Sequence, residues 1–190
     1  MKKFELTSKF ITNIFGTKLF RIKALIEFGN IKAGELGGFV EKEENLSQDG
    51  NAWVYDNACV CGDARVCDNA RVYGNAWVYD NAWVYDNACV CGDARVCDNA
   101  RVYGNAWVYD NACVCGDARV CGDACVYGDA DYATVHGFGS EYRTTTFFKT
   151  KAGDIGVKCG CFYGNLSEFR KKGSRDTWGN EKGKGILDAC

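Results

Sequence analysis

Alanine recurs at every sixth position from Ala52 to Ala130, fourteen times without a break, and this period constrains the fold more than any other feature. Valine follows two residues after each alanine, thirteen times from Val54 to Val126. Each unit reads Gly or Asp, Asn or Asp, Ala, a variable residue, Val, and then Tyr or Cys. Alternation along an extended segment places Ala and Val on one face. The sequence therefore predicts a stack of short strands with an interior of Ala and Val.

The two residues before each alanine form a corner. They are Gly-Asn, Gly-Asp or Asp-Asn pairs, which are residue types that tolerate a positive φ. Because one corner every six residues bends the chain in a constant direction, three corners close a triangular coil of eighteen residues. The expected fold class is all-β: a single-stranded, left-handed parallel β-helix of hexapeptide repeats, with four to five coils. The absence of proline agrees, since each strand needs its N–H for the neighbouring coil.

A solenoid exposes unpaired strand edges at both ends and needs caps there. We expect a β-rich N-terminal cap over residues 1–47, the β-helix over 48–140 and a C-terminal cap over 141–190. His136 and Phe138 fall in the inward Ala and Val phases, which predicts that these larger side chains fill the last coil.

The caps have their own predicted elements. The C-terminal cap is expected to be a β-hairpin around Lys151–Asp154, followed by a short helix over Leu166–Lys172 that Asn165 caps at its N-terminus. The strand segments expected in the two caps are Phe4–Leu6, Lys18–Phe28, Phe39–Val40, Thr144–Thr150 and Ile155–Phe162.

The net charge of −2 hides an asymmetry along the chain. Residues 1–47 carry eight basic and six acidic groups, residues 48–140 five Arg against thirteen Asp, and residues 141–190 ten basic against six acidic groups. The middle is thus acidic, at −8, between basic ends. No continuous basic stripe is expected along the solenoid, so direct binding of DNA or RNA by that surface is disfavoured.

Targeting features are few. No run of eighteen apolar residues exists, and the start MKKFELTSKF lacks the apolar core of a signal peptide, so neither membrane insertion nor secretion is indicated. The thirteen cysteines are an odd number with no export signal before them, which favours a reducing compartment over a disulfide framework. The expected location is the cytoplasm of a bacterium.

The solenoid also contains a duplication. Residues 51–80 and 81–110 are identical, and the first seventeen residues of that block recur at 105–121. The offsets of 30 and 24 are multiples of six but not of eighteen, so copying kept the strand phase and rotated the faces. A site built from a precise constellation would not survive such rotation unless one copy alone matters.

The outward Trp and Arg residues allow two interpretations. An eighteen-residue step places Trp83 between Arg65 and Arg101, which predicts cation–π stacks that serve stability alone. The alternative is a binding surface, because Trp and Arg anchor many interfaces. The candidate residues for that surface are Trp53, Trp77, Trp83, Trp107, Arg65, Arg71, Arg95 and Arg101. In the same arithmetic Trp53 lies beside Arg71, and Trp77 beside Arg95.

Cys-x-Cys pairs raise the question of a metal. In a strand the two thiols of a pair point to one side, so four ligands require a second pair nearby. The coil arithmetic gathers cysteines in one place only, where Cys97, Cys113 and Cys115 have Asp131 one coil further on. That set is a weak candidate for a metal site, and reduced surface thiols are the favoured interpretation. No cofactor is expected.

His136 is the only histidine. As a general base it would serve an acyltransferase acting on a hydroxyl or amine, whereas its inward phase favours a packed capping residue. No Gly-rich phosphate loop, Ser/His/Asp set or carboxylate pair with distinct environments stands out. Whether the chain is an enzyme is left open, with the balance against it.

The entry segment GTKLFRIKALIEFGNIKAGELGGFVEKEENLSQDGNAWVYDNA, the tandem NARVYGNAWVYDNA units and the exit TTFFKT and GVKCGCFYGNLSEFRKK carry a resemblance. Together they resemble the hexapeptide-repeat β-solenoid proteins of bacteriophages and prophages, over nearly the whole chain. Some of those proteins are labelled acetyltransferases, a label that rests on fold-level analogy. The resemblance supplies no catalytic motif that could be carried over to residues of this chain.

Three functional hypotheses follow. The first is a non-enzymatic phage or prophage accessory protein that binds a host protein, for example as an inhibitor of host defence or nucleic-acid enzymes whose acidic solenoid imitates a nucleic-acid surface. The second is an acyl-CoA-dependent transferase that uses His136. The third is a protein that sequesters a small ligand between subunits, and a trimer or dimer is compatible with all three.

Overall fold

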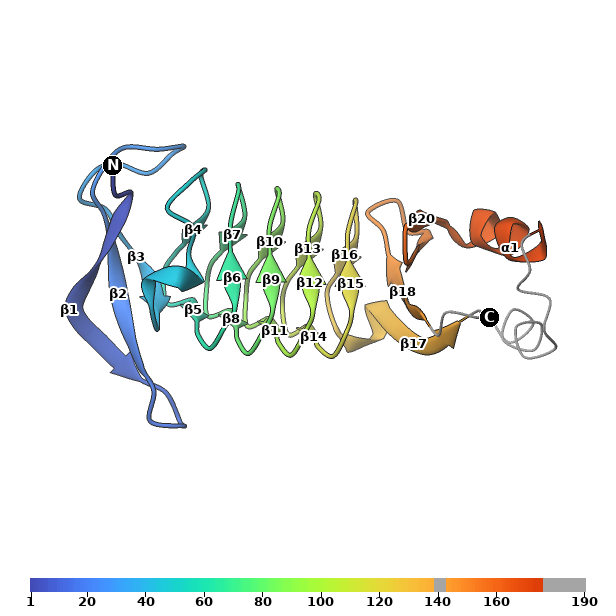
Figure 1. The fold of residues 1–190 in the computed structure, drawn as a ribbon, viewed down its shortest axis with the longest axis horizontal. Coiled ribbons are helices and arrows are strands. Elements are labelled where there is room, and N and C mark those ends of the chain that lie inside the picture. The colour runs from blue at the N-terminus through green and yellow to red at the C-terminus, as the bar shows by residue number, and fades with distance from the viewer. Residues whose placement is uncertain (139–142, 176–190) are drawn as a thin grey trace.

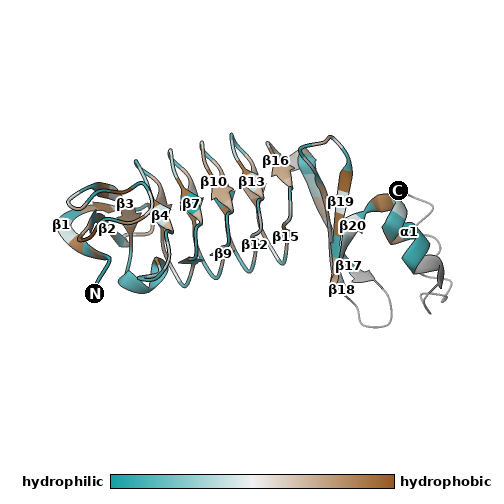
Figure 2. Ribbon diagram, turned by 90° about the horizontal axis from the view of Figure 1, so that it is seen from above, coloured by the Kyte–Doolittle hydropathy of each residue, from teal (hydrophilic) through white to brown (hydrophobic). Residues whose placement is uncertain are grey.

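The computed structural model describes residues 1–138 and 143–175 as an elongated molecule with a β-hairpin cap, a solenoid and an antiparallel sheet in succession (Figure 1). The predicted parallel β-helix is confirmed, because two-residue strands form three parallel sheets that run along the solenoid. We call these sheets face 1, face 2 and face 3. Seen from above, apolar colouring is concentrated on the strands of face 2 and the corners of the coils are largely hydrophilic (Figure 2).

Each face takes one strand from every coil. Face 1 comprises β3 (Leu36–Val40), β5 (Cys59–Val60), β8 (Trp77–Val78), β11 (Arg95–Val96) and β14 (Cys113–Val114). Face 2 comprises β4 (Trp53–Val54), β7 (Arg71–Val72), β10 (Cys89–Val90), β13 (Trp107–Val108) and β16 (Cys125–Val126). Face 3 comprises β6 (Arg65–Val66), β9 (Trp83–Val84), β12 (Arg101–Val102) and β15 (Arg119–Val120).

Neighbouring repeat strands pair residues that are eighteen apart, as Arg71 with Cys89 and Cys89 with Trp107, so the predicted coil length is confirmed. The inward Ala and Val side chains from Ala52 to Val126 are fully buried in one continuous core. Ala130, the last alanine of the period, is exposed because the chain leaves the solenoid after Val126.

The corners adopt the left-handed conformation that the sequence predicted. The first corner residue has a positive φ from Gly50 to Gly122, ranging from 50° at Asp56 to 73° at Gly74, Gly92 and Gly104, whereas Gly128, where the chain leaves the coils, is extended with a φ of −160°. Where that residue is Asp, its carboxylate often accepts a hydrogen bond from the backbone N–H of the next coil, as Asp98 does from Gly116 at 2.9 Å. The second corner residues form a ladder of side-chain hydrogen bonds through Asn51, Asn69, Asn87, Asn105 and Asp123.

The N-terminal cap extends face 1. The antiparallel strands β1 (Phe4–Thr12) and β2 (Lys18–Ala24) precede β3, and β3 pairs in parallel with β5 of the solenoid. The short 3-10 helix η1 (Glu43–Asn45) ends in a buried Asn45, whose amide donates hydrogen bonds to the carbonyls of Gly62 and Ala64. This side chain satisfies acceptors that the missing preceding coil would otherwise have served.

The C-terminal cap is a four-stranded antiparallel sheet of β17 (Tyr132–Phe138), β18 (Arg143–Lys149), β19 (Ile155–Cys159) and β20 (Phe162–Asn165), followed by α1 (Leu166–Arg175). A second 3-10 helix, η2 (Asp129–Asp131), leads into it. The predicted hairpin and helix are confirmed. Asn165 and Glu168 exchange side-chain to backbone hydrogen bonds of 2.9 Å at the start of α1, which is a capping box.

The predicted inward position of His136 is wrong. It lies on β17, which pairs antiparallel with β18 instead of continuing the coils, and its side chain is exposed. Phe148 of β18 closes the end of the core in its place and is 1% exposed. The side chain of Phe138 and the predicted boundary between 140 and 141 lie outside the described residues. Within the described ranges, no helix has the length and apolar character needed to cross a membrane.

The corner hydrogen bond can be tested with a matched pair of substitutions. Asp80 and Asp98 occupy equivalent corners of adjacent coils with φ of 60° and 57°, so alanine is strained equally at both. Asp98→Ala also removes the acceptor for the Gly116 N–H. We expect it to lower the free energy of unfolding by about 1 kcal/mol more than Asp80→Ala, measured by urea denaturation. Equal losses would contradict a stabilising role for this bond.

Candidate binding surface on face 3

The outward residues of the strands differ in exposure from face to face. On face 1, Phe39 and Cys59 are buried against the N-terminal hairpin. On face 2, Trp53, Cys89 and Cys125 are buried. On face 3, all four outward residues at the first strand position are exposed, and we call them the arginine stripe: Arg65, Trp83, Arg101 and Arg119. Face 3 is thus the face whose outward column is exposed throughout.

Trp83 organises the first three residues of the stripe. Its ring lies between the guanidinium groups of Arg65 at 5.5 Å and Arg101 at 5.6 Å, as the eighteen-residue step predicted. Each such contact is worth about 0.5–1 kcal/mol at an exposed site. Stacking therefore restricts both arginines while leaving their charged edges available to a ligand.

Tyrosines line the second outward position of the same face. Tyr85 and Tyr103 stack with ring centroids 4.9 Å apart and an interplanar angle of 2°, and Trp83 meets Tyr85 edge-on. Burial raises the pKa of Tyr103, and a hydrogen bond with Cys121 adds to this effect. Face 3 therefore presents two stacked tyrosine rings beside the arginine stripe, with Cys67 and Cys121 before and after them in the same column.

The charges of the stripe are unpaired. Three ion pairs occur among the described residues, and none involves Arg65, Arg101 or Arg119. In this column Trp83 separates Arg65 from Arg101, whereas Arg101 and Arg119 are direct neighbours. Three of the five solenoid arginines lie in one column of face 3. They come from different copies of the duplicated block.

At its C-terminal end the stripe meets the cap. A hollow of about 340 Å³ is lined by Asn99, Arg101, Asp117, Arg119, Thr144 and Gly160. Sequence reasoning missed Arg119, although it lies eighteen residues after Arg101, and missed Thr144, which only the folded cap brings there. His136 contributes indirectly, because its Nδ1 lies 3.0 Å from the Thr144 hydroxyl oxygen.

The other predicted surface residues lie on the other two faces, where Trp77 is in register with Arg95 and Trp53 with Arg71, as the eighteen-residue step predicted. Trp53 is not on the surface at all: it is 0% exposed, because Phe4 and Phe28 of the N-terminal cap pack edge-on against it. Trp77 and Arg95 lie on face 1, and Arg71 and Trp107 on face 2. The Trp107 ring is covered by Lys151 of the C-terminal cap, whose Nζ lies 5.1 Å from the ring centroid.

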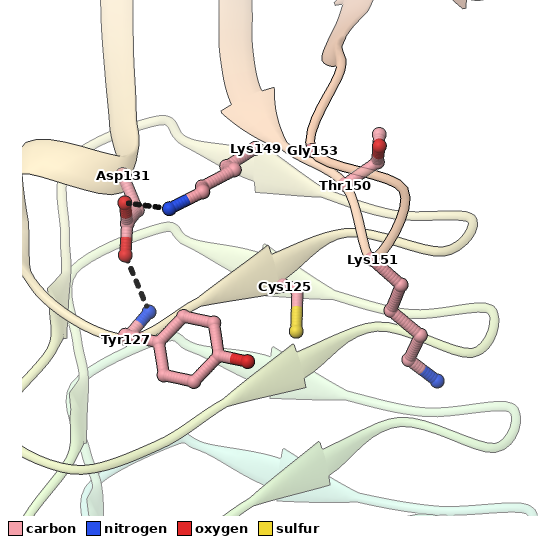
Figure 3. A pocket seen from close by; sticks show the side chains of 7 residues that line it. All are labelled: Cys125, Tyr127, Asp131, Lys149, Thr150, Lys151 and Gly153. Carbon is pink, nitrogen blue, oxygen red and sulfur yellow. Dashed lines mark hydrogen bonds and ion pairs between the residues drawn. The ribbon is translucent and has the colours of Figure 1, made fainter.

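A second hollow, of about 360 Å³, lies where face 2 meets the C-terminal cap (Figure 3). Lys149 is directed at Asp131, with 3.6 Å between its Nζ and a carboxylate oxygen, while Lys151 points away from them. The other carboxylate oxygen of Asp131 accepts a hydrogen bond from the backbone N–H of Tyr127 at 2.9 Å. The basic groups here are therefore already engaged with a carboxylate or a ring.

These contacts also correct the weak metal candidate. Asp131 turns toward Lys149, because the chain leaves the coil path at η2, so it does not join Cys97, Cys113 and Cys115. The Tyr132 hydroxyl lies beside Cys115 instead, 3.7 Å from its sulfur. Within the described residues, no three His, Cys, Asp or Glu side chains are grouped closely enough to hold a metal ion.

Burial raises the pKa of several solenoid thiols, which favours their protonated form. Burial raises the pKa of Cys59 to about 12 and that of Cys61 to about 11, and it likewise raises that of Cys97 to about 11. Several thiols form hydrogen bonds with tyrosine hydroxyls, as the Cys89 thiol does when it donates to the Tyr73 hydroxyl oxygen at 2.9 Å. Since metal binding and nucleophilic attack both need a thiolate, these positions suit packing and not chemistry.

The molecule described so far belongs in the class of parallel β-solenoid repeat proteins. A family model described as "YdcK Beta solenoid repeat" matches residues 64–80 and 94–110, which span β6 to β8 and β11 to β13. A curated relative, "Uncharacterized acetyltransferase YdcK" of Escherichia coli (strain K12), is 36% identical over 63 residues. That match covers 30% of this chain and 19% of the relative, so the chain spans about a fifth of the relative's length. The family-model segments include neither cap, and His136 and Thr144 lie outside them.

Thiol reactivity gives a direct test of the packing role. Because thiolate is the reactive form and each pKa unit changes its fraction tenfold, iodoacetamide at pH 8 should react with the native protein more slowly than with the unfolded chain, by about a hundredfold at Cys61 and about a thousandfold at Cys59. Cys161, which is exposed, serves as the control and should react rapidly in both. Peptide mass mapping of the labelled sites gives the rates. Rapid native labelling of Cys59 would contradict the interpretation.

Proposed function

We propose that the protein is a non-enzymatic binding protein of phage or prophage origin that acts in the bacterial cytoplasm and contacts a host protein through face 3. The observation that carries this proposal is the exposed stack of Arg65, Trp83 and Arg101, continued by Arg119, with no ion-pair partner among the described residues. Tryptophan, tyrosine and arginine are the residues that most often dominate binding energy at protein interfaces.

Rigidity supports the same conclusion. Arg65 and Arg101 are restricted by the Trp83 ring, and Tyr85 by Tyr103, while all of these residues stand on strands fixed by neighbouring coils. Less side-chain entropy is then lost when a partner binds. A surface ordered in the free protein is what a dedicated binding module needs.

The acidic corners serve the fold itself, which weakens the hypothesis that the solenoid imitates nucleic acid. Several of their carboxylates are bound to the next coil: Asp56, Asp68, Asp86 and Asp98 accept backbone N–H groups. The corner carboxylates also lie along three separate edges of the solenoid and do not form one continuous acidic row. We therefore assign partner contact to face 3, where acidic corners border the arginine stripe and oppose binding of polyanionic DNA or RNA.

An acyltransferase that uses His136 is the second candidate, favoured by the name of the curated relative and by the position of His136 beside the Thr144 hydroxyl. Within the described residues, no carboxylate is bonded to the imidazole, so its tautomer is not set as in a paired general base. His136→Ala that abolishes acyl transfer from a bound donor would establish this candidate and overturn the first.

Arg101 and Arg95 make a matched pair for testing face 3, because they are exposed arginines of adjacent repeat units on different faces. The wild-type protein, Arg101→Ala and Arg95→Ala are used as baits in host lysate, and the captured partner is then titrated. We expect Arg101→Ala to weaken the partner's affinity at least tenfold, about 1.4 kcal/mol, and Arg95→Ala to leave it unchanged.

Two results count against the proposal. One is a wild-type bait that recovers no stoichiometric partner. The other is a partner that binds Arg101→Ala as well as it binds the wild type. Native mass spectrometry of the wild-type bait and of Arg101→Ala checks for self-association, because a dimer or trimer that only the wild type forms would place face 3 between copies and remove it from contact with a host protein.

A further inference from the structure

The hollow at the C-terminal end of the arginine stripe has the composition of an anion site. Arg101 and Arg119 are direct neighbours on adjacent coils, in register on β12 and β15, so the two residues lie about 4.8 Å apart along the sheet. No aromatic ring separates them, in contrast to Arg65 and Arg101. Like charges directly opposite each other destabilise a sheet, and a bound anion would relieve this repulsion.

The cap supplies the opposite wall of the hollow. The Thr146 side-chain oxygen accepts a hydrogen bond of 3.0 Å from the backbone N–H of Arg119, which fixes β18 against the last coil. Thr144 is two residues away on β18 and therefore projects from the same side of that strand. Thr144 lines the hollow, and its hydroxyl oxygen lies 3.0 Å from Nδ1 of His136. When Nδ1 carries the proton, the threonine hydroxyl accepts from it and can donate its own hydrogen to a ligand.

Asp117 is the single acidic residue that lines the hollow, and one of its carboxylate oxygens is already hydrogen-bonded. Asp117 accepts a hydrogen bond of 3.1 Å from the Asn99 amide, as part of the corner ladder. Two guanidinium groups against one carboxylate leave the hollow with a net positive charge. The hollow on face 2 also has two basic side chains and one carboxylate, but there Lys149 pairs directly with Asp131 at 3.6 Å and Lys151 points away from them (Figure 3).

We propose that the hollow formed by Arg101, Arg119 and Thr144 binds a phosphate group. This inference deepens the proposed function, on which its biological role rests, by giving face 3 an anion-recognising end. Two guanidinium forks and a hydroxyl offer more donors than the two oxygens of a carboxylate can accept, whereas the three or four oxygens of a phosphate can use them. The phosphate is either the free anion or a monoester on a larger molecule.

Calorimetric titration with inorganic phosphate tests the site in the full chain, at constant chloride concentration. Arg119→Gln removes one fork without touching the Trp83 stack, and Thr144→Val removes the hydroxyl with little change of shape. Arg65→Gln is the control, because Arg65 stacks on the same Trp83 but lies away from the hollow. We expect at least a tenfold weaker phosphate affinity for Arg119→Gln, a smaller loss for Thr144→Val, and a change below twofold for Arg65→Gln.

A parallel titration with phenyl phosphate identifies the source of the group. Tighter binding of the ester than of inorganic phosphate assigns the site to a phosphate on a larger ligand, and equal or weaker binding assigns it to the free anion. Absence of phosphate binding by the wild type, or equal losses for Arg119→Gln and Arg65→Gln, would overturn the inference. Partner capture that still depends on Arg101 in that case leaves the proposed function standing, so the two failures are distinguishable.

Discussion

Backbone hydrogen bonds between coils eighteen residues apart are the interaction on which the rest of this structure depends. The Arg71 N–H donates to the Ala88 carbonyl and the Tyr73 N–H to the Val90 carbonyl, and the same pattern continues along the solenoid. Each strand is only two residues long, so it is held by the coils above and below and not by its own length. A unit longer or shorter by one residue would turn Ala and Val outward. The six-residue period is therefore a physical requirement of the ladder.

The ladder leaves unsatisfied groups at both ends, and the caps are built to satisfy them. Asn45 donates to open carbonyls at the start, and Thr146 accepts an open N–H at the end. Phe148 closes the C-terminal end of the Ala and Val interior, and Trp53, an outward residue of the first coil, is buried under Phe4 and Phe28. Capping also decides which outward side chains remain available, since the N-terminal hairpin covers the first coils of faces 1 and 2.

Face 3 gains its properties from what the caps leave uncovered. Arg65 and Arg101 are held by Trp83, and neither they nor Arg119 form an ion pair with a carboxylate among the described residues, so their hydrogen-bonding groups are available to a partner. Rotation of the copied blocks separated the tryptophans onto three faces, yet it also placed Arg101 and Arg119 in one column. The proposed contact with a host protein and the proposed phosphate site both draw on that column.

By itself the sequence determined the β-helix, the eighteen-residue coil, the left-handed corners, the Trp83 stack and the helix capped by Asn165. These follow from local periods and from residue types whose conformational preferences act within a few positions. Only the tertiary structure decided that Trp53 is buried, that His136 is exposed, that Asp131 pairs with Lys149, and that Thr144 meets Arg119. Each of those outcomes depends on how a cap packs against a coil distant in sequence, and such contacts carry no periodic signal.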